Sequence, residues 1–557
     1  MDQRSIGESV PGFVPGRRAV LKGGLSGLGL AAFGLSASAC STASKAAADG
    51  LKGATATLPA FVPFTGTTAD LPGQMAQGIQ PGYFHYPASP PQSVQGAVGD
   101  GKPLSLLVSG PPIGSQQGGN QWWQSLNHKL GVDLQVTQVD SLNYASKFTV
   151  DVAGGDYQDM MQILSAPNEP ELLASKFIDL SDHLNGDKVK QYPNLAALPP
   201  QAWTAGMVNG HLFGISQPRS IAGQVMNTRQ DILDQLGLGS PTLSSGADFL
   251  ALCKEVTDPA KHRWAMGTQP VLLTLRTILE MMGAPKGWQV EGGKFTRDIE
   301  LPVYLDALSE LRNWWSAGIF HPDSFTNSGS YLTWWYGGVT VIYMQAFAGW
   351  TVAAQNNPTL KFGALVMPKW GGGGPAVKHL EAGNYLFTAI KKADQNRVED
   401  ILRVWNYLAA PFGTQEYLEV NYGVAGHDYT LNGSDPVMSA TGTQELIAGL
   451  SYVGSTRSTV IYVPNQEDLV RQAHAFQAAV VPTGISDPTD RLYSATQLAQ
   501  GAAAEKLLTD VKNDIVLGRK PVSDFKAAVD TWRTSVGNTI RGEYEKAYAA
   551  TASSGSN

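Results

Sequence analysis

The sequence predicts an α/β fold with a parallel β-sheet, because short apolar runs alternate with segments of helical periodicity from about residue 103 onward. The run 104–108 (LSLLV) predicts the first strand. Apolar residues then recur at helical spacing from Trp122 to Leu130, and Gly131 ends this predicted helix. The strict alternation of residues 132–136 (VDLQV) predicts a second strand.

The pattern then repeats. Residues 144–153 predict a helix, Gly154 and Gly155 break it, and residues 160–164 (MMQIL) predict a third strand. Alternation of this kind gives right-handed crossovers, and ligands bind at the carboxyl ends of the strands in such sheets. We therefore expect binding residues in the loop after Val108 and in the loop 165–169.

The first 39 residues have the pattern of an export signal. Arg17 and Arg18 precede a weakly hydrophobic, glycine-rich run, which resembles the signal of the twin-arginine route. This run is at the short end for a spanning helix, so we interpret residues 1–39 as a signal peptide that is removed. The Ala39-Cys40 pair resembles the end of a lipoprotein signal. We therefore expect cleavage before Cys40, lipidation of that cysteine and attachment of the protein to the outer face of the cytoplasmic membrane. The alternative is ordinary cleavage after Ala37-Ser38-Ala39, which would release a soluble protein.

Composition narrows the class of partner. The chain has two cysteines, so no disulfide framework is expected once Cys40 is lipidated, and its net charge of −7 argues against nucleic acid as a partner. It contains 13 Trp and 19 Tyr but only 16% charged residues, and such rings stack on the apolar faces of sugars. These features favour a carbohydrate ligand.

Several segments in a fixed order resemble the extracellular solute-binding proteins of ABC importers, family 1. They are 209–216 (NGHLFGIS), 232–238 (ILDQLGL) with Pro241-Thr242 behind it, 336–350 ending at Gly349-Trp350, and 383–390 (GNYLFTAI). The sequence departs from the family at 245–249 (SGADF), where a Trp-Asp-Glu-Phe motif is usual, and the tail from residue 430 is longer than in compact members.

The resemblance implies a two-lobed, type II clamp of the periplasmic-binding-protein kind, with a hinge and a ligand cleft between the lobes. The expected organisation is a tether and partly packed segment at 40–102, a first lobe at 103–217 and a second lobe at 218–363. Residues 364–419 are expected to return to the first lobe, and 420–557 to form part of the second lobe and a C-terminal helical extension.

The expected ligand-binding residues come from exposed loops and from positions that the resemblance marks. Tryptophans 264, 334, 335 and 350 are predicted as platforms for sugar rings, with Trp350 favoured by its position in the family motif. The remaining residues are polar or aromatic groups near predicted strand ends and lobe crossings: Gln117, Asn120, Trp122, Asn168, Glu169, Gln217, Arg219, Asn384 and Tyr385. Asn120 has the alternative interpretation of a helix N-cap, and Trp122 that of a core residue.

The predicted function is capture of a carbohydrate, most simply an oligosaccharide, and its delivery to the membrane subunits of an ABC permease by a monomeric protein. The competing hypothesis is a secreted carbohydrate-active enzyme, for which Glu169, Asp323 and Glu381 would have to converge. No cofactor or metal site is expected, because the run Gly371 to Gly374 lacks a following Lys-Ser/Thr and the nine histidines are scattered. We therefore expect a binding protein with no catalytic residues.

Overall fold

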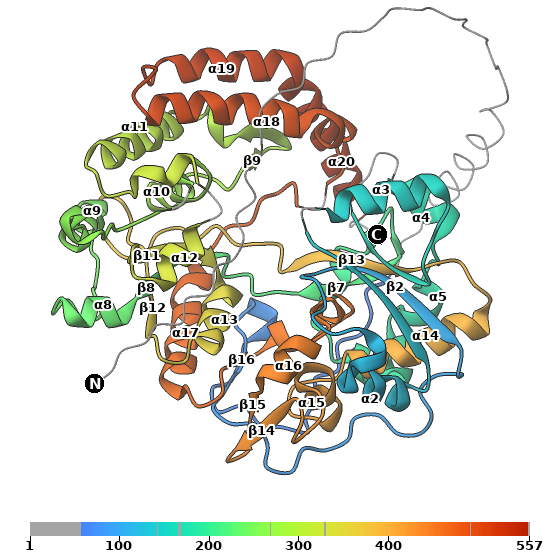
Figure 1. Ribbon diagram of the computed structural model, residues 1–557. Coiled ribbons are helices and arrows are strands. Elements are labelled where there is room, and N and C mark those ends of the chain that lie inside the picture. Colours follow the sequence, from blue (N-terminus) through green and yellow to red (C-terminus); the bar gives the residue numbers. More distant parts are fainter. Residues whose placement is uncertain are drawn as a thin grey trace, which may run out of the picture. The chain divides into compact units, whose positions relative to one another are not determined.

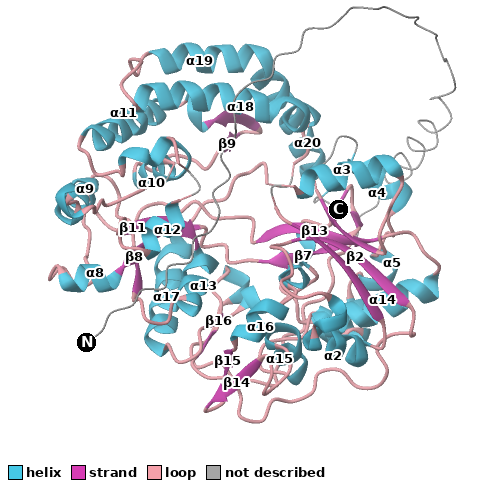
Figure 2. Cartoon of the chain, viewed as in Figure 1, coloured by secondary structure: helices cyan, strands magenta, loops and turns pink. Residues whose placement is uncertain are grey.

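The computed structural model describes residues 57–554, apart from residues 142, 165–168, 268, 328–329 and 491. The predicted signal peptide, Cys40 and Asn168 lie outside these residues. Two separate β-sheets organise this part of the chain, one of five strands and one of three, as Figures 1 and 2 show.

The five-stranded sheet has the order β3-β2-β4-β13-β7. Strands β2 (Pro103–Ser109), β3 (Asp133–Val139) and β4 (Met160–Ile163) are parallel, and β13 (Asn384–Ile390) runs antiparallel between β4 and β7 (Gly214–Pro218). The three predicted parallel strands are thereby confirmed. Strand β13 is far from β4 and β7 in the sequence, yet it pairs with both and so joins β7 to the sheet.

Side chains of β2 alternate between two cores. Leu106 packs on one face with α2 (Gln121–Leu130) and α14 (Gln395–Leu408), whereas Leu107 packs on the other with α3 (Tyr144–Gly154). Gly131 ends α2 in the left-handed conformation, as the sequence predicted. Shorter helices complete this part: α4 (Glu169–Lys176), α5 (Ser181–Leu184), α6 (Pro193–Ala196), α7 (Gln201–Thr204), α15 (Gln415–Tyr422) and α16 (Ala440–Glu445).

The three-stranded sheet has β8 (Gln224–Arg229) at its centre, antiparallel to both β11 (Ile342–Ala346) and β12 (Phe362–Leu365). The helices of this part are α8 (Gln230–Gln235), α9 (Gly246–Val256), α10 (Leu275–Met281), α11 (Pro302–Ser316), α12 (Tyr331–Tyr336), α13 (Phe347–Asn356) and α17 (Glu467–Val480). Neighbouring β8 residues again face different cores, because Val225 packs with α13 and α17, whereas Met226 packs with α9, α10 and α11.

The C-terminal region is helical and packs on α11. Figure 1 shows α18 (Ala495–Val516) and α19 (Asp524–Trp532) side by side above α11, with α20 (Asn538–Ser554) beyond them. The ring of Tyr304 stacks on that of Phe525 at a centroid distance of 5.4 Å. The hairpin of β9 (Trp288–Glu291) and β10 (Lys294–Arg297) packs against the same helices.

The segment 440–453 differs from the predicted grouping of residues 420–557 with the second lobe, whereas α17 to α20 agree with it. Ile447, Leu450 and Val453 pack in the core of the five-stranded sheet, and α16 contacts α2. The reason is that apolar residues of this segment pack beside β2 and β7. No local sequence pattern predicts this packing. Small strands complete the fold: β14 (Tyr429–Asn432) with β15 (Asp435–Met438), β1 (Gly82–Tyr83) with β16 (Ile461–Tyr462), and β5 (Met207–Val208) with β6 (His211–Leu212).

Several residues of the segment 40–102, which was expected to be a tether and partly packed, lie in the cores. Val98 joins the core of the five-stranded sheet, Ile79 joins the core beside β8, and Tyr86 lies in an aromatic cluster with Phe412 and Tyr417. The portion of the chain covered by the structure contains no helix with the length and apolar character that a membrane crossing requires.

Candidate functional site

The chain passes between the two sheets at two neighbouring places. One passage follows β7, and the other precedes β13, whose first residues pair with the end of β7 at Asn384↔Pro218 and Tyr385↔Gln217. The amide of Arg219 donates to the carbonyl of Gly383 at 2.8 Å. Gly383 has a φ of +77°, and a Cβ there would lie 2.8 Å from Ile221, so only glycine fits this close approach of the two passages.

A cavity of about 550 Å³ lies beside these passages. Its wall includes Ile163 at the carboxyl end of β4, which agrees with the expected position of a ligand in such a sheet. Residues from α4, α7, both passages and the loop 486–490 complete the wall, and the polar ones are Glu169, Gln201, Thr204, Glu381, Asn384, Ser486, Asp487 and Asp490.

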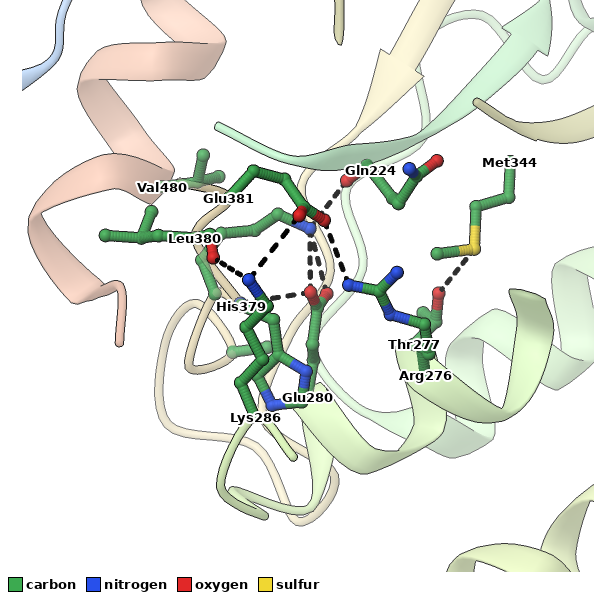
Figure 3. A network of polar contacts seen from close by, with 12 residues as sticks. Gln224, Arg276, Thr277, Glu280, Lys286, Met344, His379, Leu380, Glu381 and Val480 are labelled. Carbon is green, nitrogen blue, oxygen red and sulfur yellow. Dashed lines mark hydrogen bonds and ion pairs between the residues drawn. The ribbon is translucent and has the colours of Figure 1, made fainter. Parts of the chain in front are cut away.

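Carboxyl groups dominate the polar lining, and two cations partly neutralise them. The guanidinium of Arg276 lies 3.0 Å from Oε1 of Glu381, and Nζ of Lys286 lies 3.4 Å from Oε2, as Figure 3 shows. Burial acts to raise the pKa of Glu381, but Lys286 and Arg276 together outweigh it, so the pKa lies below its ordinary value. Glu381 is therefore ionised at neutral pH.

Two aspartates of the loop 486–490 have a different electrostatic environment. Burial raises the pKa of Asp487, although its Oδ1 accepts hydrogen bonds from the amide and hydroxyl of Thr489 at 2.8 and 2.6 Å. Burial also raises the pKa of Asp490, which lies 3.7 Å from Nζ of Lys286. These carboxyl groups add hydrogen-bond acceptors to the wall of the cavity.

Amide groups occupy the side of the cavity formed by α7 and β13. Nδ2 of Asn384 donates to Oγ1 of Thr204 at 2.8 Å and to the carbonyl of Gln201 at 3.2 Å. Oε1 of Gln201 is buried without a hydrogen-bond partner among the described residues. The lining also includes apolar groups, so the wall presents both acceptors and an apolar surface.

Two of the predicted binding residues, Glu169 and Asn384, line this cavity. Three more lie together at the neighbouring chain passages. The guanidinium carbon of Arg219 is 4.1 Å from the centre of the Tyr385 ring, and Gln217, 8% exposed, accepts a 3.4 Å hydrogen bond from Arg219. The structure therefore brings these five residues to one region of the fold.

The residues predicted after the first strand lie elsewhere, around the start of α2. Nε2 of Gln117 donates to Asp133 at 2.7 Å, at the beginning of β3. Asn120 caps α2 through a 2.7 Å bond to the amide of Trp123, and Nε1 of buried Trp122 donates to the carbonyl of Glu419. Their side chains are engaged with protein groups, and none of the three lines the cavity.

The predicted tryptophan platforms fall into two groups, neither of which lines the cavity. Trp264 and Trp334 flank the His321 ring at centroid distances of 4.6 and 4.0 Å. Trp335 and Trp350 are 0% and 1% exposed in the core beside β8 and α13, where neither indole nitrogen has a hydrogen-bond partner among the described residues. A ligand-binding role for these four tryptophans stays a prediction.

Most of the polar lining was not predicted. Glu381 was expected only as a possible catalytic carboxylate, although this residue stands three positions before Asn384. The cluster 486–490 (SDPTD) was not among the expected binding residues, although its two aspartates beside a proline are a recognisable polar loop signal. Gln201 and Thr204 carry no such signal, because a short helix places them in the wall.

Comparison with known proteins gives independent information on the family. The family model of bacterial extracellular solute-binding proteins matches residues 114–415, which is more than half of the chain. The polygalacturonan/rhamnogalacturonan-binding protein YtcQ of Bacillus subtilis is 24% identical over 414 residues, covering 69% of this chain and 82% of the relative. Lipoprotein LipO of the same species is 23% identical over 473 residues, covering 76% and 88%.

A solved structure shows the same fold. It is that of an HMO-binding, ABC-transporter-associated solute-binding protein of Bifidobacterium longum infantis. The TM-score is 0.60 at 15% sequence identity, over 81% of this chain and 99% of that chain. The predicted α/β fold class is thereby confirmed.

Proposed function

Since the chain belongs to the bacterial extracellular solute-binding proteins, as the sequence predicted, we propose that it captures an oligosaccharide in the cavity beside the chain passages. Members of this family bind solutes and do not transform them, and the carbohydrate-active enzyme is set aside. The observation that carries the proposal is the cavity of about 550 Å³, which has a size ordinary for small-molecule sites and draws its lining from both sides of the passages.

The lining matches the chemistry of a sugar. Hydroxyl groups donate hydrogen bonds, and ionised acceptors such as the Glu381 carboxylate form the stronger ones. The apolar surface of Ile163, Ile221 and Phe387 in the same wall suits the C–H face of a pyranose ring. A ligand of many hydroxyls and few charges therefore satisfies both kinds of surface.

The acidic lining favours a neutral oligosaccharide over a polyuronate. The wall carries four carboxyl groups, whereas the nearby cations Arg276 and Lys286 are already engaged with Glu381. A uronate carboxylate entering this cavity would meet like charges with no free cation among the lining residues. We therefore expect weak binding of oligogalacturonates, although the relative YtcQ is named for binding polygalacturonan.

Delivery to a transporter requires that ligand binding favours closure of the two parts of the protein around the cavity. A ligand that touches residues on both sides of the two passages stabilises the closed arrangement by its differential affinity for it. The membrane subunits of an ABC importer then recognise the closed form and accept the released sugar. Export by a twin-arginine signal and a lipid on Cys40 would hold the monomer at the outer face of the cytoplasmic membrane.

Calorimetric titration of the purified protein tests this function. The panel should hold neutral oligosaccharides of two to six units and oligogalacturonates of equal length. We expect a neutral member to bind one-to-one and to raise the melting temperature, while chromatography recovers it unchanged. The proposal fails if no neutral sugar binds or if the recovered sugar is shortened.

Two variants locate the binding site. Asn384→Ala and Glu381→Gln each remove a polar group from the wall, and we expect about tenfold or greater loss of affinity from each. Gln117→Ala is the matched control, because Gln117 is a polar residue outside the cavity. Equal affinity in all three variants would place the sugar elsewhere.

A further inference from the structure

Three metal-ligating side chains outside the cavity converge near the start of α2. Nε2 of His427 lies 3.2 Å from Oε1 of Glu445 and 3.9 Å from Oδ1 of Asp428. One ligand atom from each residue can be chosen so that all three lie within 4.8 Å of one another. Oxygen and nitrogen ligands of a tetrahedral cation, each about 2.0–2.1 Å from it, lie about 3.3 Å apart. The separations of 3.2 and 3.9 Å from His427 are close to this spacing.

The environment of Asp428 is a second, independent observation that points to a cation. This residue is 0% exposed, and its Oδ1, the atom that faces His427, is buried without a hydrogen-bond partner among the described residues. Its Oδ2 accepts a 2.7 Å bond from the amide of Val424. A buried carboxylate oxygen with no donor is costly, and a bound cation supplies the charge that it lacks.

The backbone around Asp428 is shaped to hold this carboxylate in place. Gly423 has a φ of +83°, and a Cβ there would lie 2.5 Å from Oδ2 of Asp428. A Cβ on Gly442 would lie 2.3 Å from the carbonyl oxygen of Asp428. Both close approaches require glycine, so the polypeptide encloses Asp428 from the turn and from α16.

Outer contacts hold the Glu445 carboxylate and the backbone of His427. Oε2 of Glu445 accepts a 3.0 Å hydrogen bond from the amide of Trp122 at the start of α2, which leaves Oε1 directed to His427. The carbonyl of His427 accepts a 2.9 Å bond from the hydroxyl of Ser439. Groups that hold metal ligands in this way commonly accompany metal sites.

We propose that His427, Asp428 and Glu445 bind one divalent transition-metal cation of the zinc class. One imidazole and two carboxylates are a ligand set suited to Zn²⁺, and the His427 side chain, 31% exposed, leaves an entry path and a position for water. Ca²⁺ prefers six to eight oxygen ligands and is excluded by this set. The ion would bind Nε2 of His427 in its unprotonated form and would link α16 and the turn at 423–428 to α2. This departs from the expectation of no metal site, because the ligands become neighbours only through folding.

Titration of the tag-free full chain with ZnCl₂, followed by calorimetry, tests the site. We expect one-to-one binding, and Co²⁺ should give visible absorption bands of a four-coordinate nitrogen–oxygen site. His427→Ala and Asp428→Asn should each weaken Zn²⁺ binding at least tenfold, since even outer-shell changes cost about 10–100-fold. His128→Ala removes an exposed histidine elsewhere on α2 and should bind as the wild type does.

Asp428→Asn also separates a metal role from a purely structural one. The asparagine carbonyl can keep the hydrogen bond from Val424, while the charge that has no partner is removed, so this variant should melt at or above the metal-free wild-type temperature. Zn²⁺ should raise the melting temperature of the wild type but not that of this variant. The proposal is overturned if Zn²⁺ does not bind, or if it binds equally to all three variants.

Discussion

The guanidinium of Arg219 stacks on the ring of Tyr385, with its carbon 4.1 Å from the ring centre. Tyr385 in turn lies 5.7 Å from the ring of Tyr452, centroid to centroid. These residues come from the passage after β7, from β13 and from the turn 448–452. Three segments that are distant in sequence therefore meet where the chain passes between its sheets.

We expect Arg219→Lys to destabilise this junction. An ammonium cannot reproduce the flat stacking of a guanidinium on an aromatic ring, and such contacts contribute about 0.5–2 kcal/mol. Urea unfolding should show a loss in that range. Tyr385→Phe keeps the ring and should change the free energy of unfolding by less than about 0.5 kcal/mol. Equal stability of Arg219→Lys and wild type would mean that the stack contributes nothing.

A buried ion pair links the chain passage before β13 to α10. Nζ of Lys378 lies 2.9 Å from Oε1 of Glu280, and their side chains are 8% and 4% exposed. Nζ also donates to the carbonyl of Gln224, and the amide of His379 donates to Glu280. The pair links the segment before Glu381 to β8 and to α10, the helix that carries Arg276.

Glu280→Gln and Lys378→Met should each cost about 3–5 kcal/mol, because each leaves one buried charge without its partner. The double variant should cost clearly less than the sum of the two, since no unpaired charge remains. Chemical unfolding of the four proteins measures this coupling. Strictly additive losses would show that the two charges do not stabilise each other.

The pH dependence of stability should carry the signature of Asp298. Burial raises the pKa of this carboxyl to about 6, from an ordinary value of 3.8. Between these two values the folded state binds more protons than the unfolded chain does, so the free energy of unfolding falls as pH rises through this window. The side chain of Asp298→Asn does not titrate, so this contribution to the pH dependence of the free energy of unfolding is absent from the variant.

The stability gain of Asp298→Asn over wild type should therefore grow from pH 4 to pH 7, by at most about 3 kcal/mol, and then level off. Unfolding curves at four pH values measure this gain. Asp306→Asn, an exposed change on α11, serves as the control and should show no such trend. A difference in the free energy of unfolding between Asp298→Asn and wild type that does not change with pH would contradict the raised pKa.

The parts of the fold that were predicted correctly depend on local pattern. Strands β2, β3 and β4 and helices α2 and α3 carry their own apolar pattern, and the two helices end at glycines, so sequence alone indicates these elements. The strand pairing in the sheet around β8 was not predicted, because it joins β8 to β11 and β12, which lie more than a hundred residues downstream. Pairing across such distances depends on packing that no window of sequence contains.

The residues that line the cavity likewise divide into those that a local pattern indicates and those that distant parts of the chain bring together. Glu169 and Asn384 were predicted because they stand at the ends of elements that the sequence marks. The aspartates of the loop 486–490 were missed, since about a hundred residues separate them from β13. Burial also depends on the whole fold, which is why Trp350 could be placed at a family position but not assigned to core or cavity from sequence.

Trp350 gives a direct test of that assignment. Its indole is 1% exposed and packs edge-on against Phe347 and Phe476. Trp350→Ala should cost about 3–5 kcal/mol by opening a void, whereas Trp350→Phe should cost clearly less, because the indole N–H has no hydrogen-bond partner to lose.

Folded Trp350→Phe should bind the captured sugar within about twofold of the wild-type affinity, since the ring does not line the cavity. Titration of this variant beside Asn384→Ala measures the difference between a core residue and a wall residue. A tenfold or greater loss in Trp350→Phe with an unchanged melting temperature would instead place this ring in contact with the ligand, because a packing defect alone lowers stability before it lowers affinity.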